Sequence, residues 1–168
     1  SLTFAAPATA GDYTLAWCAD DPTAFDLVDE GDETNNWGAP ITLTVRDPNS
    51  VDIGGATGYN QILFTDGDGT TVRLRLRGDG AANVAFGGDN FAAIGNRRCV
   101  TVTGIDLAIG RVTLFDTTER TTLAVNARGG DGIATIATVA GTTPLRAVRA
   151  RNVDLVGEGL LLTGAQGY

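Results

Sequence analysis

The sequence has no histidine, no lysine and no methionine, and all twelve of its basic residues are arginine. Without histidine the chain cannot build a Ser-His-Asp triad, a Cys-His dyad or an imidazole metal site. Without lysine it has neither the phosphate-binding lysine of a P-loop nor a Schiff-base lysine. A pair of carboxylates is the main catalytic device that remains. Because no such pair has a recognisable context, we predict that the chain is not an enzyme.

Aromatic residues are also scarce, at 7%, and no segment repeats apolar residues with the i, i+3, i+4 spacing of an amphipathic helix. Glycine is abundant instead, with 23 residues, and valine and threonine recur in short alternating runs. Alternating β-branched residues predict strands, and recurring glycines predict turns. We therefore expect an all-β chain. No apolar run reaches the roughly eighteen residues of a membrane span, so we expect no membrane insertion in this segment.

The net charge of -8 is unevenly distributed along the chain. Residues 1–47 contain nine acidic residues and one arginine, whereas residues 48–168 contain eleven acidic residues and eleven arginines. This change in charge, together with the turn-forming segment Asp47-Pro48-Asn49-Ser50, predicts two modules, residues 1–47 and residues 48–168. The acidic first module argues against nucleic acid as a partner, because its carboxylates would repel phosphates.

Two segments of the first module, residues 13–17 and 41–45, alternate as strands of a half-buried antiparallel sheet do. The stretch between them is rich in Asp, Asn and Gly, so we expect a loop that joins two paired strands. Together with Ala6-Pro7 and Cys18-Ala19-Asp20, the element Glu33-Thr34-Asn35-Asn36 before the last strand resembles the closing third of a CARDB domain, a family related to bacterial cell adhesion.

The resemblance covers residues 1–46 and implies an immunoglobulin-like β-sandwich whose earlier strands are missing. Three strands cannot form both sheets of a sandwich. We therefore expect the other strands in the rest of a larger parent polypeptide, or packing against the second module. The family also implies an extracellular or cell-surface protein, with surface glycans or other adhesion proteins as further partners.

The second module consists of short strands rich in valine, leucine and threonine, with glycine about every ten residues between them. Its last part is nearly repetitive, with strand-like runs at residues 145–150, 153–157 and 160–164. Such regular spacing predicts the rungs of a β-solenoid of the right-handed β-helix kind, continuing downstream. Residues 60–168 also resemble the β-helical segments of large bacterial surface proteins. The alternative is a second β-sandwich, which has strands of similar length.

Two acidic clusters are candidate calcium sites, because Ca²⁺ binds several carboxylate oxygens on a tight loop. One cluster lies in the loop of the first module and consists of Asp26, Asp29, Glu30, Asp32 and Glu33. The other is formed by Asp66 and Asp68, in a run that lacks the third ligand and the bidentate glutamate of an EF-hand. For both clusters the alternative is a turn with solvated carboxylates. Calcium is the one cofactor that the sequence indicates.

Arg73, Arg75 and Arg77 alternate with apolar residues, which places their guanidinium groups on one face of a strand, about 6.8 Å apart. Such a ladder can bind an acidic polysaccharide, because guanidinium groups form bidentate contacts with carboxylates. The alternative is that these arginines pair with Asp or Glu on neighbouring strands, or are solvated.

The two cysteines, Cys18 and Cys99, lie one in each module. They are candidates for a disulfide within the chain, for a pair of buried thiols, or for bridges to residues outside the chain. The spacing does not choose among these alternatives.

Three functions are compatible with these features. The first is a non-catalytic structural or adhesive segment of a secreted or cell-surface bacterial protein. The second is a module that binds glycans, through calcium on the acidic loop or through the arginine ladder. The third is a fragment of a polysaccharide-degrading β-helix enzyme, which would need a carboxylate pair in a groove.

Overall fold

The computed structural model describes residues 11–15, 41–45 and 47–164. The chain divides into two compact units, Ser1–Pro48 and Asn49–Tyr168. In the first unit β1 (Gly11–Leu15) pairs antiparallel with β2 (Ile41–Val45). The expected pairing is confirmed for residues 13–15 with 41–43, and residues 16 and 17 of the expected strand lie outside the described residues. The loop between them lies outside the described residues, and with it the predicted calcium ligands Asp26, Asp29, Glu30, Asp32 and Glu33, and Cys18.

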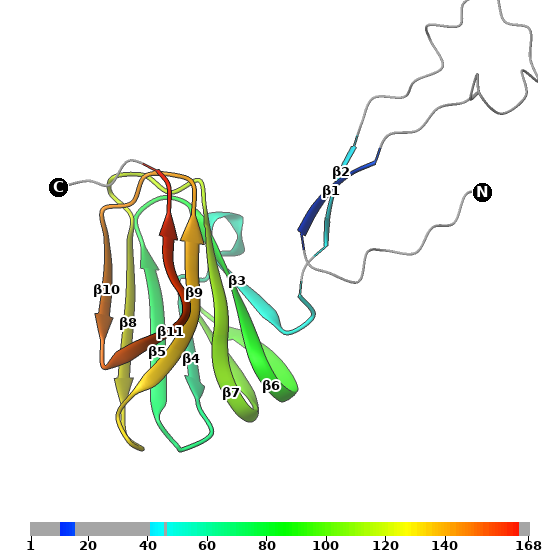
Figure 1. Cartoon of the computed structure of the whole chain (residues 1–168). Helices are drawn as coiled ribbons and strands as arrows, with labels where there is room; N and C mark the ends of the chain where they lie inside the picture. The colour runs from blue at the N-terminus through cyan, green and yellow to red at the C-terminus, as the bar shows by residue number, and fades with distance from the viewer. Residues whose placement is uncertain (1–10, 16–40, 46, 165–168) are drawn as a thin grey trace, which may run out of the picture. The chain divides into compact units, whose positions relative to one another are not determined.

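In its described part, the second unit consists of strands and one short 3-10 helix, η1 (Gly55–Thr57) (Figure 1). The expectation of an all-β chain is therefore confirmed for the described residues. In chain order the strands are β3 (Ser50–Gly54), β4 (Gln61–Thr65), β5 (Thr71–Arg77), β6 (Ala81–Asn96), β7 (Cys99–Phe115), β8 (Thr122–Arg128), β9 (Ala134–Gly141), β10 (Ala147–Arg151) and β11 (Val153–Leu162).

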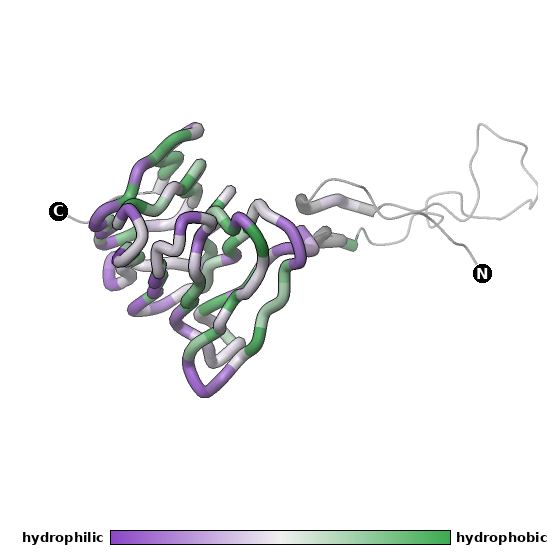
Figure 2. The backbone as a smooth tube through the Cα atoms, turned by 90° about the horizontal axis from the view of Figure 1, so that it is seen from below, coloured by the Kyte–Doolittle hydropathy of each residue, from purple (hydrophilic) through white to green (hydrophobic). Residues whose placement is uncertain are grey.

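The alternation of side chains explains why these segments form strands. In β5, Val72, Leu74 and Leu76 are buried, whereas the arginines between them point outward. Successive side chains of a strand point to opposite faces, so an alternating sequence buries one face and exposes the other. Figure 2 shows hydrophobic and hydrophilic positions alternating along the strands of this unit.

The long hairpin of β6 and β7 belongs to two layers of the mixed sheet (Figure 1). Residues 81–86 and 109–115 of the hairpin belong to layer A, where the strand order is β3-β6-β7-β9-β11. Residues 92–96 and 99–103 belong to layer B, where the order is β6-β7-β4-β5-β8-β10. One hairpin thus connects the two layers.

The hairpin changes layer at a group of bulges between Ala85 and Ala92, where the register of β6 against β7 shifts three times. Bulges bend a strand and increase its twist. Glycine is required at the centre of this bend: Gly88 has a φ of +112°, and a Cβ there would lie 2.5 Å from the carbonyl oxygen of Ile105.

The last four strands pair in parallel, β10 with β8 and β11 with β9. Asn152, with a φ of +57°, joins β10 to β11, so one residue carries the chain from layer B to layer A. Asparagine tolerates this left-handed conformation better than most residues. Within the described part of the chain, β10 and β11 each have one strand partner, so they form an edge of the two layers.

The hydrophobic core lies between the layers and takes side chains from both of them. Phe64 of layer B and Phe86 of the bend make an edge-on contact, with ring centroids 5.1 Å apart. The largest side chains with almost no exposure include Ile53, Ile62, Leu74, Leu107, Ile109, Leu123 and Ile136. Among the described residues, no helix has the length and apolar character needed to cross a membrane.

Candidate anion-binding face

The outer face of layer B carries an array of arginines from three adjacent strands. β5 contributes Arg73, Arg75 and Arg77, and β10 and β8 contribute further arginines on the same side of the sheet. Their shared orientation follows from the register, in which outward residues of one strand stand opposite outward residues of the next. We call this surface the arginine face and define it by Arg73, Arg75, Arg77, Arg128, Arg149 and Arg151.

One row of residues crosses the whole of layer B. It begins at Arg149 of β10 and passes through Ala124 of β8 to Arg75 of β5. It then continues through Gln61 of β4 and Cys99 of β7 to Asn96 of β6. Strands in a sheet lie about 4.8 Å apart, so these six positions span about 24 Å.

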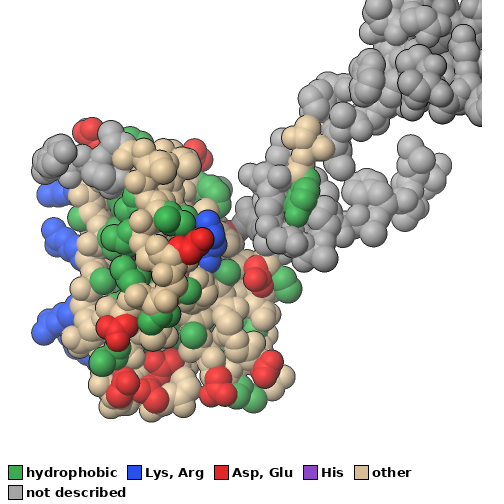
Figure 3. Space-filling model, viewed as in Figure 1, with side chains coloured by type: hydrophobic (Ala, Val, Ile, Leu, Met, Phe, Trp, Pro, Cys, Tyr) green, Lys and Arg blue, Asp and Glu red, His purple; other side chains and the backbone are tan. Residues whose placement is uncertain are grey.

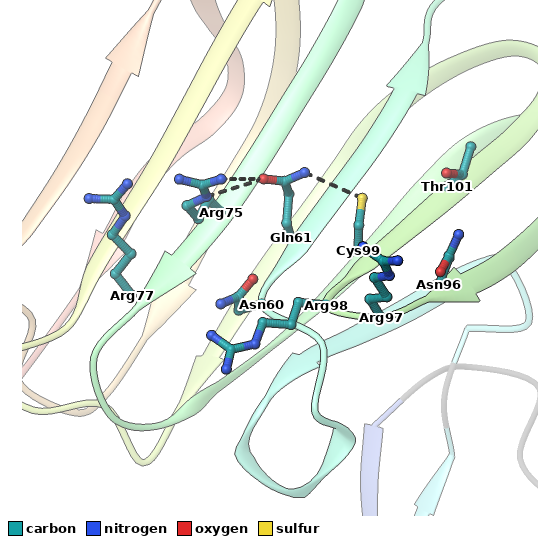
Figure 4. Close-up of a pocket in the computed structure, with 9 residues that line it drawn as sticks. All are labelled: Asn60, Gln61, Arg75, Arg77, Asn96, Arg97, Arg98, Cys99 and Thr101. Carbon is teal, nitrogen blue, oxygen red and sulfur yellow. Dashed lines mark hydrogen bonds between the residues drawn. The ribbon is translucent and has the colours of Figure 1, made fainter.

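Hydrogen bonds fix the middle of this row (Figure 4). Arg75 donates from Nη2 and Nε to Gln61 Oε1, at 2.6 and 3.2 Å. Gln61 in turn donates from Nε2 to Cys99 Sγ at 3.3 Å. Both nitrogens donate to the same amide oxygen, which holds the Arg75 side chain in place. Because the amide is neutral, it does not compensate the positive charge of Arg75.

The adjacent row repeats the pattern one step along the strands. Arg151 of β10 stands opposite Asn126 of β8, which stands opposite Arg73 of β5. In both rows, therefore, two arginines flank a small or amide side chain of β8. The spacing between the two arginines of a row is two strands, or about 10 Å along the sheet.

None of the strand segments that form layer B contains an acidic residue among the described positions. The predicted alternative, pairing of Arg73, Arg75 and Arg77 with acids of neighbouring strands, is therefore absent from the register. Arg111, outside layer B, does form an ion pair, with Glu158 at 3.8 Å, and both side chains are more than half exposed. Figure 3 shows the separation: basic side chains lie along the side formed by β8 and β10, and acidic side chains gather at one end of the strands.

A depression of about 660 Å³ continues the arginine face toward β6 and β7. Arg97, in the turn of the β6–β7 hairpin, lies at one side of it, Arg75 and Arg77 lie at the other, and the side chain of Arg98 extends between them near Asn60 (Figure 4). The rest of the lining is polar and consists of Asn60, Gln61, Asn96, Cys99 and Thr101. Four guanidinium groups with amide and hydroxyl neighbours, and no carboxylate, form a site suited to an anion.

Arg97 adopts an unusual backbone conformation in this turn, with a φ of +54°. A side chain with a Cβ is strained in the left-handed region, where glycine or asparagine is the ordinary choice. An arginine in a strained position whose side chain borders a cationic depression is consistent with a need for its charge there.

The second predicted calcium site is a tight turn between β4 and β5. Asp66 Oδ1 accepts hydrogen bonds from the backbone N–H groups of Asp68 and Thr70. Asp68 accepts from the N–H of Thr70 and, through its other oxygen, from the N–H of Asp131. The carboxylates thus serve as acceptors for the turn itself. Among the described residues no group of three or more potential ligands is placed to hold a metal ion.

The pKa values of the two carboxylates of this turn are shifted in opposite directions. Burial and the hydrogen bond with Asp68 raise the pKa of Asp66 above its ordinary value. Hydrogen bonds from Asp66 and Thr70 lower the pKa of Asp68. At neutral pH the turn therefore depends on the ionised Asp68, whose Oδ2 accepts the hydrogen bond from the Asp131 N–H of the β8–β9 loop.

Among the described residues Cys99 has no disulfide partner, and it is half-buried beside Gln61. Its predicted partner, Cys18, lies outside the described residues, so a bridge between them stays a prediction.

The structure adds residues that the sequence reasoning missed. The sequence pattern indicates the ladder on β5, but not its continuation by Arg149 and Arg151 on β10, nor the turn residues Arg97 and Arg98. The alternation in Ala147-Val148-Arg149-Ala150-Arg151 is the signal that could have found the β10 arginines. No local signal identifies Gln61, because its role depends on a non-local register.

Comparison with family models, with curated proteins and with solved structures finds no match to this chain. The resemblances to a CARDB domain and to β-helical surface proteins therefore stay predictions.

Proposed function

We propose that this chain is a non-catalytic module that binds an acidic polysaccharide on the arginine face. The observation that carries the proposal is a sheet surface with six arginines and no acid, within a chain of net charge -8. The arginines of β5 and β10 stand two strands apart, about 10 Å, with no acid between them in the register, so their like charges repel one another. An anionic ligand would remove this repulsion.

The chemistry of the face favours a polysaccharide over other polyanions. Amide and hydroxyl side chains lie between the arginines, including Asn126, Gln61 and Thr122, and these can bind sugar hydroxyls. The outward positions of layer B hold no aromatic residue among the described strands, whereas single-stranded nucleic acids are bound largely by stacking on aromatic side chains. The regular row of about 24 Å suits a linear ligand with repeated carboxylates.

For the fold, we propose a sandwich of layers A and B whose last strands wind as two rungs of a β-solenoid. The parallel pairs β8–β10 and β9–β11 support the rungs, and the antiparallel pairs β3–β6, β4–β5, β5–β8 and β6–β7 support the sandwich. The predicted role as a structural or adhesive segment at the cell surface is compatible with this proposal, since a stalk that binds glycans is an adhesive element.

The test is isothermal calorimetry of the full chain with polygalacturonate, a sulfated glycan, neutral dextran and single-stranded DNA. We expect binding to the acidic glycans that weakens with added salt, because exposed charges are screened. The variant Arg73→Gln/Arg75→Gln should lose at least about tenfold in affinity, since two charge-assisted contacts are removed. The matched control is Arg111→Gln/Arg120→Gln, which removes the same charge away from the arginine face.

Equal losses of affinity in the two variants would mean that binding depends only on the net charge of the chain, and would refute specific binding at the arginine face. Absence of binding to both acidic glycans would refute the proposed function. Stronger binding of DNA than of the glycans would assign the face to nucleic acid instead.

A further inference from the structure

The edge formed by β10 and β11 is apolar on its inner side. Leu155 and Leu160 of β11 stand opposite the buried residues Ile136 and Val139 of β9, yet they are 43% and 49% exposed. Val148 of β10 is half-buried against the same core. The core is therefore open to solvent at this edge in the described part of the chain, and two strands present unpaired backbone groups there.

The two edge strands carry opposite charges on their outer sides. β10 contains Arg149 and Arg151 and no acid, whereas β11 contains Asp154 and Glu158 and no arginine. Each strand is thus complementary to the other and not to itself. The ion pair of Glu158 with Arg111 is long and exposed, so it leaves the Glu158 carboxylate available to another arginine.

We propose that a second copy of this chain covers the edge, with β10 of each copy beside β11 of the other. β10 and β11 run in opposite directions in the two layers (Figure 1). A two-fold axis parallel to the strands would therefore set β10 antiparallel to β11 of the second copy, at both layers at once. Such an interface is isologous and closed, and it leaves no free strand at this edge.

Charge selects this arrangement over the other two-fold arrangement. An axis perpendicular to the layers would pair β10 with β10 and β11 with β11, so arginines would face arginines and acids would face acids. Like charges opposite each other destabilise a strand pair, and opposite charges stabilise it. The pairing of β10 with β11 brings arginines to acids on the outside, and Val148, Leu155 and Leu160 together on the inside.

The experiment is sedimentation equilibrium of the full chain over a range of concentrations. The chain should form a dimer. Arg149→Glu/Arg151→Glu and Asp154→Arg/Glu158→Arg should each raise the dissociation constant at least about tenfold, since attractive cross-strand pairs become repulsive. The variant with all four substitutions should recover dimer formation. Arg73→Glu/Arg75→Glu is the control, because it makes the same charge change away from the edge.

Recovery in the fourfold variant supports the pairing of β10 with β11, and its absence overturns it, as does a monomeric parent chain. Should a variant fail to fold, hydrogen exchange of the unaltered chain decides. Protection of the amides of residues 147–162 that rises with concentration supports the dimer. Protection that is independent of concentration would assign the edge to a segment of the same chain and would overturn the proposal.

Discussion

Replacing Arg97 by asparagine should stabilise the chain and at the same time weaken its binding to an acidic polysaccharide. The left-handed conformation at Arg97, with a φ of +54°, costs a residue with an ordinary side chain roughly 1–2 kcal/mol. Asparagine adopts this conformation more readily and removes one of two adjacent positive charges. We expect a gain of about 1 kcal/mol in the free energy of unfolding, which corresponds to roughly 2–4 °C in Tm for a chain of this size.

The same substitution removes an exposed cation from the edge of the depression. An exposed charge contact contributes about 0.2–1 kcal/mol, so affinity should fall by a factor of about 1.4 to 5. Thermal unfolding and calorimetry with polygalacturonate measure the two effects. Arg98→Asn is the matched control, since Arg98 lies in the same turn and, unlike Arg97, is not among the residues of positive φ. It should lose affinity without gaining stability. A Tm for Arg97→Asn at or below that of the parent chain would refute the reasoning.

Three further predictions follow from individual contacts. Gln61→Leu removes the acceptor that holds Arg75, so affinity for polygalacturonate should fall about fivefold by calorimetry, whereas Tm changes by no more than a few degrees. The lowered pKa of Asp68 stabilises the fold above the ordinary pKa of an aspartate, and this contribution is lost as the pH falls. The raised pKa of Asp66 stabilises the fold at low pH instead, and this contribution is lost as the pH rises. Melting curves should therefore show that Asp68→Asn lowers Tm at pH 7 and less so in acid, and that Asp66→Asn does not lower it at pH 7. Thr117→Val leaves the carbonyl of Pro144 without its 2.6 Å hydrogen bond, and urea unfolding should show a loss of about 1–3 kcal/mol with an unchanged m-value.

Most strands of this chain were predictable because apolar and polar residues alternate along them, which distinguishes the buried face from the exposed face. In β5 the alternation of arginine with valine and leucine defines which side is buried, and burial follows it at every position. The pairing of β1 with β2 was predictable for the same reason. The extent of β6 and β7 was not. Their bulges interrupt the alternation, and glycine-rich sequence in this region predicts turns as well as it predicts a bent hairpin.

The candidate site was predictable only within a single strand. The ladder of Arg73, Arg75 and Arg77 follows from period-two spacing. Its extension to Arg149 and Arg151 requires the knowledge that β8 lies between β5 and β10, a non-local register that a short sequence pattern does not encode. The role of Asp66 and Asp68 could not be predicted either, because the same residues occur in calcium-binding loops and in turns whose carboxylates accept hydrogen bonds from the turn backbone.

The most direct test of the central claim is an NMR titration of the arginine side-chain Nε–H groups with polygalacturonate. The proposed function predicts that the signals of Arg73, Arg75 and Arg77 shift together and saturate with one affinity, while those of Arg111 and Arg120 stay in place. Uniform small shifts of all arginines, or shifts confined to residues outside the arginine face, would contradict it.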